Sequence, residues 1–129
     1  MVITAPARQA FPAIKFFKDS VADILAGHKT LGPRPRTRTL AWIRSIERAG
    51  YASLTYGPRL GPPTIFATAR VTDITMRPFE TATAEDLKRL DRDWRGENPE
   101  RFVIEYMRWY AKELTKGYPV AWISIEIAP

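Results

Sequence analysis

The longest regular pattern in the chain covers residues 64–76, and this pattern requires a β-sheet. Polar residues alternate there with residues that favour strands, which are Ile65, Phe66, Val71 and Ile74. The turn sequence GPRLGPP occupies 57–63, and a shorter strand pattern precedes it at 52–56. A hairpin of these two strands is marginal on its own, so further strands have to pair with it.

A closing strand is predicted at 119–127, where the sequence PVAWISIEI alternates clearly. We expect the strands at 52–56, 64–76 and 119–127 to belong to one mixed, curled sheet. The segment 13–17 is consistent with a short strand or with the start of a helix. Gly32, Pro33 and Pro35 make 28–38 a loop or an irregular edge.

Two helices are predicted in the first half of the chain. Ser20 and Asp23 have the spacing of a capping box, and Gly27 fits the position after a helix, which places a helix at 20–26. Thr39 is a candidate cap for a helix at 40–49, which Gly50 ends. One face of that helix is apolar: Leu40, Ile43 and Ile46.

Two more helices are predicted in the second half. Thr83 and Asp86 form another capping-box spacing before a helix that extends to about Trp94. The sequence Asn98-Pro99-Glu100 starts a helix that extends to about Thr115 and stops before Gly117. Strands and helices do not alternate regularly, which favours an α+β fold over a doubly wound sheet. At 129 residues the chain has room for one domain at 13–129, preceded by an arm at 1–12.

The residues that are absent exclude several kinds of chemistry. The chain has no Cys and a single His, His28, so disulfides, iron–sulfur clusters and the usual zinc sites are excluded. No Gly-rich loop has the lysine and spacing of a nucleotide-binding P-loop. We therefore expect no metal and no cofactor. The apolar runs are too short to span a bilayer, so a soluble, cytoplasmic protein with no membrane partner is expected.

The positive charge is concentrated in one part of the chain. The formal net charge is +6, and residues 24–72 hold eight basic residues against one acid, Glu47, for a net charge of +7. A small domain with this balance is expected to bind an anionic partner, with nucleic acid as the first candidate.

Five segments follow one another along the chain: ADILAGHKT at 22–30, ATARVTDI at 67–74, DLKRLDRDW at 86–94, ERFVIEYMRWY at 100–110 and PVAWISIEI at 119–127. Taken in this order, they resemble the ASCH domain, a branch of the PUA-like superfamily. The resemblance implies a PUA-like, partly open β-barrel with flanking helices. It also implies a cleft that faces nucleic acid or a modified nucleoside.

The chain departs from the family's Lys-Thr-x-Thr-x-Arg run at one position. Lys29, Thr30 and Arg34 match this run, but Gly32 stands at the second Thr position. Alternatively, if the match is shifted along the chain, Thr37 or Thr39 takes the Thr role and Arg38 takes the Arg role. Family members that hydrolyse acylated cytidine use Lys, Thr and Glu together, and Asp93 is the residue assigned here to the acidic role.

The favoured hypothesis is recognition of single-stranded RNA, or of a modified nucleobase, in a basic cleft. The residues expected to contact the nucleic acid are Lys29, Arg34, Arg36, Arg38, Tyr56 and Arg70. Trp42 and Tyr51 are further candidates for base stacking. Tyr106, Trp109 and Tyr110, which lie at helical spacing, are assigned to the core.

A hydrolase in the same cleft is the second hypothesis, so the sequence leaves enzymatic activity open. It would act on an acyl-amide of cytidine or on RNA. The resemblance then makes Lys29 the base and Thr30 the nucleophile or orienting group. Arg34 or Arg38 would stabilise the anion, with Asp93 as the supporting acid. A protein-interaction module is the third hypothesis, and the oligomeric state stays open.

Overall fold

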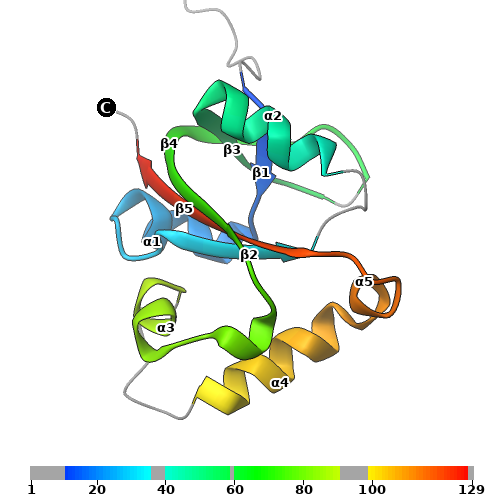
Figure 1. The fold of residues 1–129 in the computed structure, drawn as a ribbon. Coiled ribbons are helices and arrows are strands. Elements are labelled where there is room, and N and C mark those ends of the chain that lie inside the picture. The colour runs from blue at the N-terminus through cyan, green and yellow to red at the C-terminus, as the bar shows by residue number, and fades with distance from the viewer. Residues whose placement is uncertain (1–10, 36–39, 59, 91–98, 128–129) are drawn as a thin grey trace, which may run out of the picture.

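The computed structural model describes residues 11–35, 40–58, 60–90 and 99–127 (Figure 1). It has an α+β architecture, in which a curled five-stranded sheet forms a half-barrel flanked by helices. The strand order is β1-β3-β4-β5-β2, with β1 parallel to β3 and every other pair antiparallel. The strands are β1 (Ala13–Lys15), β2 (Leu31–Pro35), β3 (Tyr51–Tyr56), β4 (Thr64–Met76) and β5 (Val120–Ile127). The prediction of one mixed, curled sheet is confirmed.

The long strand β4 causes the sheet to curl. Its first half pairs with β3 and its second half with β5. The register shifts once in each pairing, between Leu54 and Thr55 in β3 and between Val71 and Asp73 in β4. Such irregularities bend a strand and increase its twist. The two halves of β4 therefore belong to different sides of the half-barrel, and β1 and β2 are left as its two free edges.

Alternation along β5 separates two hydrophobic cores. Ala121, Ile123 and Ile125 point into the first core, whereas Val120 and Trp122 point into the second. The first core also receives Ile24 from α1 (Val21–Leu25), with Ile43 and Ile46 from α2 (Ala41–Ala49). The second core lies between the sheet and three helices, α3 (Ala84–Leu90), α4 (Pro99–Trp109) and α5 (Ala111–Thr115).

One of the two predicted capping boxes forms. Thr83 and Asp86 form the predicted capping box: the Asp86 backbone N–H donates to Thr83 Oγ1 at 3.2 Å, and the Thr83 N–H donates to Asp86 Oδ2 at 2.9 Å. The capping box predicted at Ser20 does not form. A 3-10 turn, η1 (Lys18–Ser20), leads directly into α1, so the Ser20 backbone is already helical and its side chain makes no cap.

Two elements differ from the predictions. The segment 28–38 contains the regular edge strand β2, in which Pro33 and Pro35 pair with β5. The helix predicted to extend to Thr115 breaks at Tyr110 into α4 and α5, although neither Gly nor Pro stands there. A further 3-10 turn, η2 (Phe79–Thr81), follows β4.

Some predictions fall on residues outside the described ranges. These are the cap at Thr39, the end of the helix near Trp94, and most of the arm at 1–12. The last two arm residues are described and lie beside β3: the Phe11 N–H donates to Ser53 Oγ at 3.3 Å, and the Pro12 carbonyl accepts from Ser53 N–H at 3.0 Å. None of the described helices has the length and apolar character needed to cross a bilayer.

Candidate functional site

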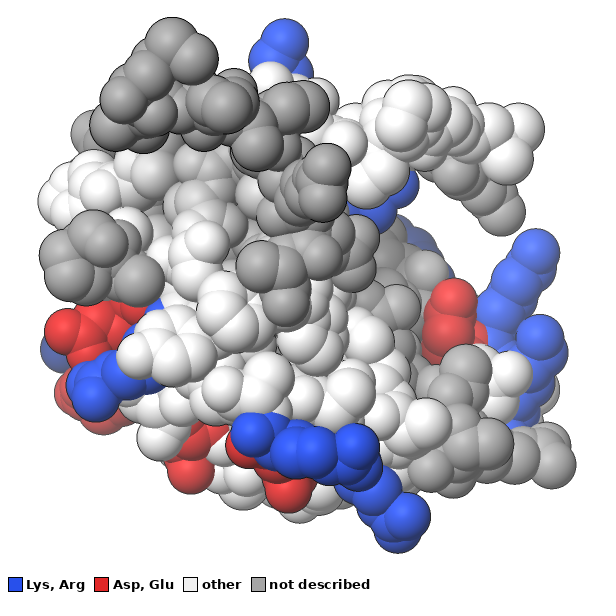
Figure 2. Space-filling view, turned by 90° about the horizontal axis from the view of Figure 1, so that it is seen from above, with Lys and Arg blue, Asp and Glu red and all other residues white. Residues whose placement is uncertain are grey.

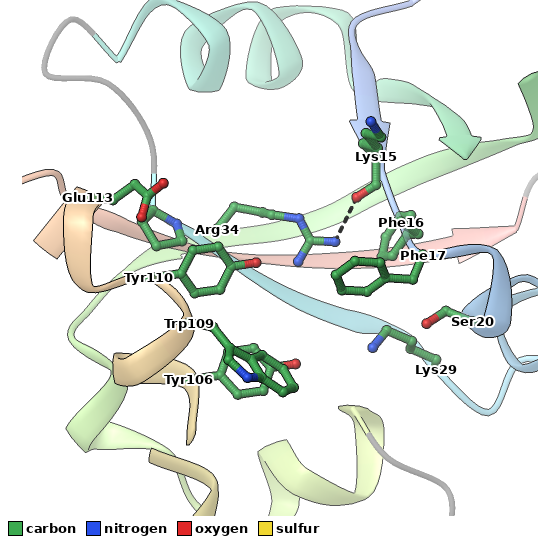
Figure 3. Close-up of a pocket in the computed structure, with 11 residues that line it drawn as sticks. Lys15, Phe16, Phe17, Ser20, Lys29, Arg34, Tyr106, Trp109, Tyr110 and Glu113 are labelled. Carbon is green, nitrogen blue, oxygen red and sulfur yellow. Dashed lines mark hydrogen bonds between the residues drawn. The ribbon is translucent and has the colours of Figure 1, made fainter. Parts of the chain in front are cut away.

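One arginine spans the gap between the two free edges of the sheet. Arg34 of β2 donates through Nη2 to the Lys15 carbonyl oxygen of β1 at 3.0 Å. Its Nη1 donates to the carbonyl of Pro33 at 2.9 Å, and its guanidinium carbon lies 4.7 Å from the centre of the Phe16 ring. The guanidinium is therefore held at the mouth of the half-barrel with its charge near the surface (Figure 3).

Gly32 makes this arrangement possible. It stands two residues before Arg34, so the two positions lie on the same face of β2. A Cβ atom at Gly32 would lie 3.2 Å from Arg34 Nη1. The missing side chain thus leaves the space that the guanidinium occupies.

A cleft of about 250 Å³ opens at this gap. One wall comes from the end of β1 and the turn after it, and Arg34 crosses the back (Figure 3). The opposite wall comes from α4 and α5. We call this the aromatic cleft, and its lining residues are Lys15, Phe16, Phe17, Ser20, Lys29, Arg34, Pro35, Tyr106, Trp109, Tyr110 and Glu113. Its volume is near the lower end of the range of small-molecule sites.

The aromatic wall is anchored from behind and exposed in front. Tyr106 and Tyr110 both pack on the buried ring of Phe79, with ring centres 5.6 and 5.8 Å apart from it. The Trp109 ring packs against the Tyr106 ring, with ring centres 5.1 Å apart, and the Trp109 side chain is 62% exposed. Across the cleft, Phe17 is 76% exposed. Two large rings that face solvent across one cleft are available for a ligand to cover.

Lys29 contributes a second cation to the cleft. It follows the turn after α1, and its Nζ donates to the Leu90 carbonyl at the end of α3, at 3.3 Å. This bond directs the half-buried side chain across the lower part of the cleft, beside Ser20 (Figure 3). Lys29, just before β2, and Arg34, near the end of β2, therefore line the same cleft.

Thr30 points elsewhere. Its hydroxyl accepts from Arg89 Nε at 3.0 Å, and its carbonyl accepts from Arg89 Nη2 at 3.2 Å. Its N–H donates to the Arg89 carbonyl at 2.9 Å. Thr30 thus fastens the start of β2 to α3 and is not among the residues that line the aromatic cleft.

The remaining predicted site residues that the structure describes, Tyr56 and Arg70, do not line the cleft. Tyr56, at the end of β3, lies next to the cleft but not in it. Arg70 lies on the exposed face of β4, and its Nη2 donates to Glu126 Oε2 at 2.7 Å. This carboxylate, through the hydrogen bond and its charge, raises the pKa of the Arg70 guanidinium. Three predicted residues lie outside the described ranges: Arg36, Arg38 and Asp93.

The sequence reasoning missed the aromatic side of the cleft. The helical spacing assigns Tyr106, Trp109 and Tyr110 to the core, and it gives no role to Phe17 or Glu113. The available signal was the spacing of 106, 109, 110 and 113 by three and four residues, which puts them on one helical face. Tyr106 and Tyr110 do pack on the second core, so that assignment was partly right.

The surface charge is local rather than continuous. On the face shown in Figure 2, the described Lys and Arg side chains lie in separate groups, and most groups have Asp or Glu beside them. The excess charge at 24–72 therefore forms no single basic patch there among the described residues.

No group of three or more metal-binding side chains occurs within the described ranges.

Comparisons with known proteins agree on the fold alone. No family model matches the sequence, and no relative is found among curated proteins. The hypothetical protein PH0355 has a similar structure, with a TM-score of 0.64 and 19% identity over 90% of this chain and 97% of that one. The protein EF3133 from Enterococcus faecalis V583, of the DUF984 family, has a TM-score of 0.55 and 16% identity over 84% and 66% of the two chains.

Proposed function

We propose that the aromatic cleft recognises single-stranded RNA or a modified nucleobase. The observation that supports this most directly is the pairing of two cations, Arg34 and Lys29, with exposed rings in one small cleft. Sequence-tolerant binding of single strands combines these two features: bases stack on aromatic side chains while cations follow the phosphates.

We also propose that the half-barrel is a PUA-like barrel of the ASCH kind. The order of the elements and the gap between β1 and β2 are compatible with a partly open barrel. The cleft that contains Lys29 and Arg34 lies beside the segment that carries the resemblance, GHKT.

Each side of the cleft has a separate task in this proposal. The flat faces of Trp109 and Phe17 stack on a base, and the Arg34 guanidinium donates to a phosphate oxygen in a charge-assisted bond. Glu113, on the aromatic side, is positioned to accept from an amino group on the base edge.

Salt dependence is the first test. With three or four phosphates neutralised, the slope of log K against log salt should be roughly −2 to −3 for a single strand. The measurement is fluorescence anisotropy of a labelled single-stranded RNA at several salt concentrations. An affinity that does not change with salt would contradict the proposal and favour a protein-interaction module.

Trp109→Ala is the second test. Loss of one stacked base should weaken binding about 5- to 150-fold. Ile104→Ala is the matched control, because Ile104 is 58% exposed on the same helix but does not line the cleft. Equal affinities of the two variants would contradict the assignment of the site.

The hydrolase alternative retains one supporting observation, the position of Lys29 in the cleft. The Thr30 hydroxyl is held by Arg89 outside the cleft lining. Recognition without turnover therefore stays the favoured proposal.

A further inference from the structure

A second cavity lies next to the aromatic cleft and shares Phe17 with it. This cavity measures about 560 Å³ and is lined by Lys15, Phe16, Phe17, Lys18, Tyr56, Gly57 and Pro58. We call it the Tyr56 cavity. Lys15, Phe16 and Phe17 line both cavities, so the two are neighbours that share one wall.

Phe17 forms the ridge between the two cavities because of the alternation along β1. Ile14 and Phe16 are buried in the first core, so Lys15 and Phe17 point outward. Phe17 lies just past the strand with an extended backbone, before η1 begins. Its ring is exposed and lines both cavities, so a ligand in either cavity can contact it.

The Tyr56 cavity offers the same two kinds of group as the aromatic cleft. Tyr56 is half-buried, and its ring is supported by Phe66 with ring centres 6.0 Å apart. Lys15 Nζ donates to the Pro58 carbonyl at 3.2 Å, which holds its ammonium at the cavity. Lys18 is exposed beside it, and no acidic residue is among the described residues of the lining.

We infer that the two cavities form one track for at least two consecutive nucleotides of a single RNA strand. One base occupies the aromatic cleft, the next lies against Tyr56, and the strand crosses Phe17 between them. Lys15 and Lys18 lie along the crossing, where the linking phosphate passes. This inference rests on the proposed function, and it makes an oligonucleotide rather than a free nucleoside the ligand class.

The test compares ligands of increasing length on the whole protein. Isothermal titration with a nucleoside monophosphate, a dinucleotide and a single-stranded RNA of eight residues or so should show a clear gain in affinity from the first to the second. Tyr56→Ala should weaken dinucleotide binding about 5- to 150-fold and leave mononucleotide binding unchanged. Tyr56→Phe, which keeps the ring, should bind like the parent protein.

A charge variant tests the track independently of Tyr56. Lys18→Gln should make the salt slope for RNA less negative by about 0.7, the share of one phosphate contact. Lys88→Gln is the matched control, because Lys88 is exposed on α3 and lies in neither lining. Both variants remove one surface charge, so a difference between them reports on position.

The outcomes separate this inference from the proposed function. A mononucleotide that binds as tightly as the dinucleotide, with no effect of Tyr56→Ala or Lys18→Gln, overturns the track and leaves the aromatic cleft intact. Absence of binding by every RNA ligand overturns both proposals.

Discussion

Gly32 has no side chain, and the Arg34 guanidinium folds back over the space that this leaves. Gly32 therefore helps to set where this cation of the cleft lies.

Gly32→Ala tests this role. The added methyl group would meet Arg34 Nη1 at 3.2 Å, and the flexible end of the arginine side chain would move aside. We expect RNA affinity to fall several-fold, while the free energy of unfolding changes by less than about 1 kcal/mol, since Ala is no worse than Gly in a strand. Affinity and urea denaturation are both measured. A large loss of stability with unchanged affinity would show that Gly32 serves packing alone.

Lys29→Arg distinguishes a binder from an enzyme. Arg keeps the charge, so binding should be nearly unchanged if Lys29 meets a phosphate. A guanidinium stays protonated and cannot act as a base, and proton transfer is worth about 10²- to 10⁴-fold in rate. The assay follows turnover of N4-acylcytidine and of RNA. We expect weak or no turnover in the parent protein; strong turnover that is lost in Lys29→Arg would establish the hydrolase instead.

At the scale of elements, the Asp86 carboxylate stabilises α3 through two interactions. Asp86 caps the helix through the Thr83 N–H and also pairs with Arg77, whose Nη2 lies 2.8 Å from Asp86 Oδ1. The Arg77 guanidinium in turn lies 3.9 Å from the Trp122 ring centre. Asp86 thus links the start of α3 to the second core, which supports the aromatic cleft from below.

The two members of the capping box should differ in their contribution to stability. Thr83→Ala removes a cap and should cost about 1 kcal/mol. Asp86→Ala also removes the carboxylate partner of Arg77 in a largely buried site, although Arg77 keeps its hydrogen bonds to Thr81, and should cost about 3 kcal/mol. Urea denaturation of both variants checks this order. Equal losses would mean that the Arg77 pair adds nothing beyond the cap.

Sequence patterns predicted the elements where the signal is local. Alternation predicted β3, β4 and β5, and the Thr83–Asp86 spacing predicted the start of α3. The break at Tyr110 and the helical backbone of Ser20 have no local signal, because each depends on how neighbouring segments pack. The same reason limits what the sequence predicts about the site. A sequence motif predicted Lys29 and Arg34, but helical spacing does not indicate which residues lie across the cleft from Trp109.

At the scale of the whole molecule, β5 makes the two cores interdependent. Its alternate residues pack into both, so we expect the loss of this strand to disrupt both cores. Trp122, 1% exposed, also donates through Nε1 to the Arg77 carbonyl at 2.9 Å.

Trp122→Ala should therefore weaken the molecule as one unit. We expect a loss of about 3–5 kcal/mol in the free energy of unfolding. Unfolding followed by far-ultraviolet and by near-ultraviolet circular dichroism should give coincident transitions in the parent protein and in the variant. Two separated transitions would mean that the cores unfold independently.

The prolines of β2 affect whether the sheet edges of two copies of this molecule can pair. The Thr30 carbonyl accepts from the Ile125 N–H at 2.9 Å. Because hydrogen-bonded positions alternate along an antiparallel pair, the backbone N–H and carbonyl groups of Gly32 and Arg34 point toward β5. The backbone nitrogens of Pro33 and Pro35 then point away from β5, and neither carries an N–H that a further strand could bond, while both prolines are buried. This edge of the sheet is therefore poorly suited to pairing with a strand from another copy of the molecule.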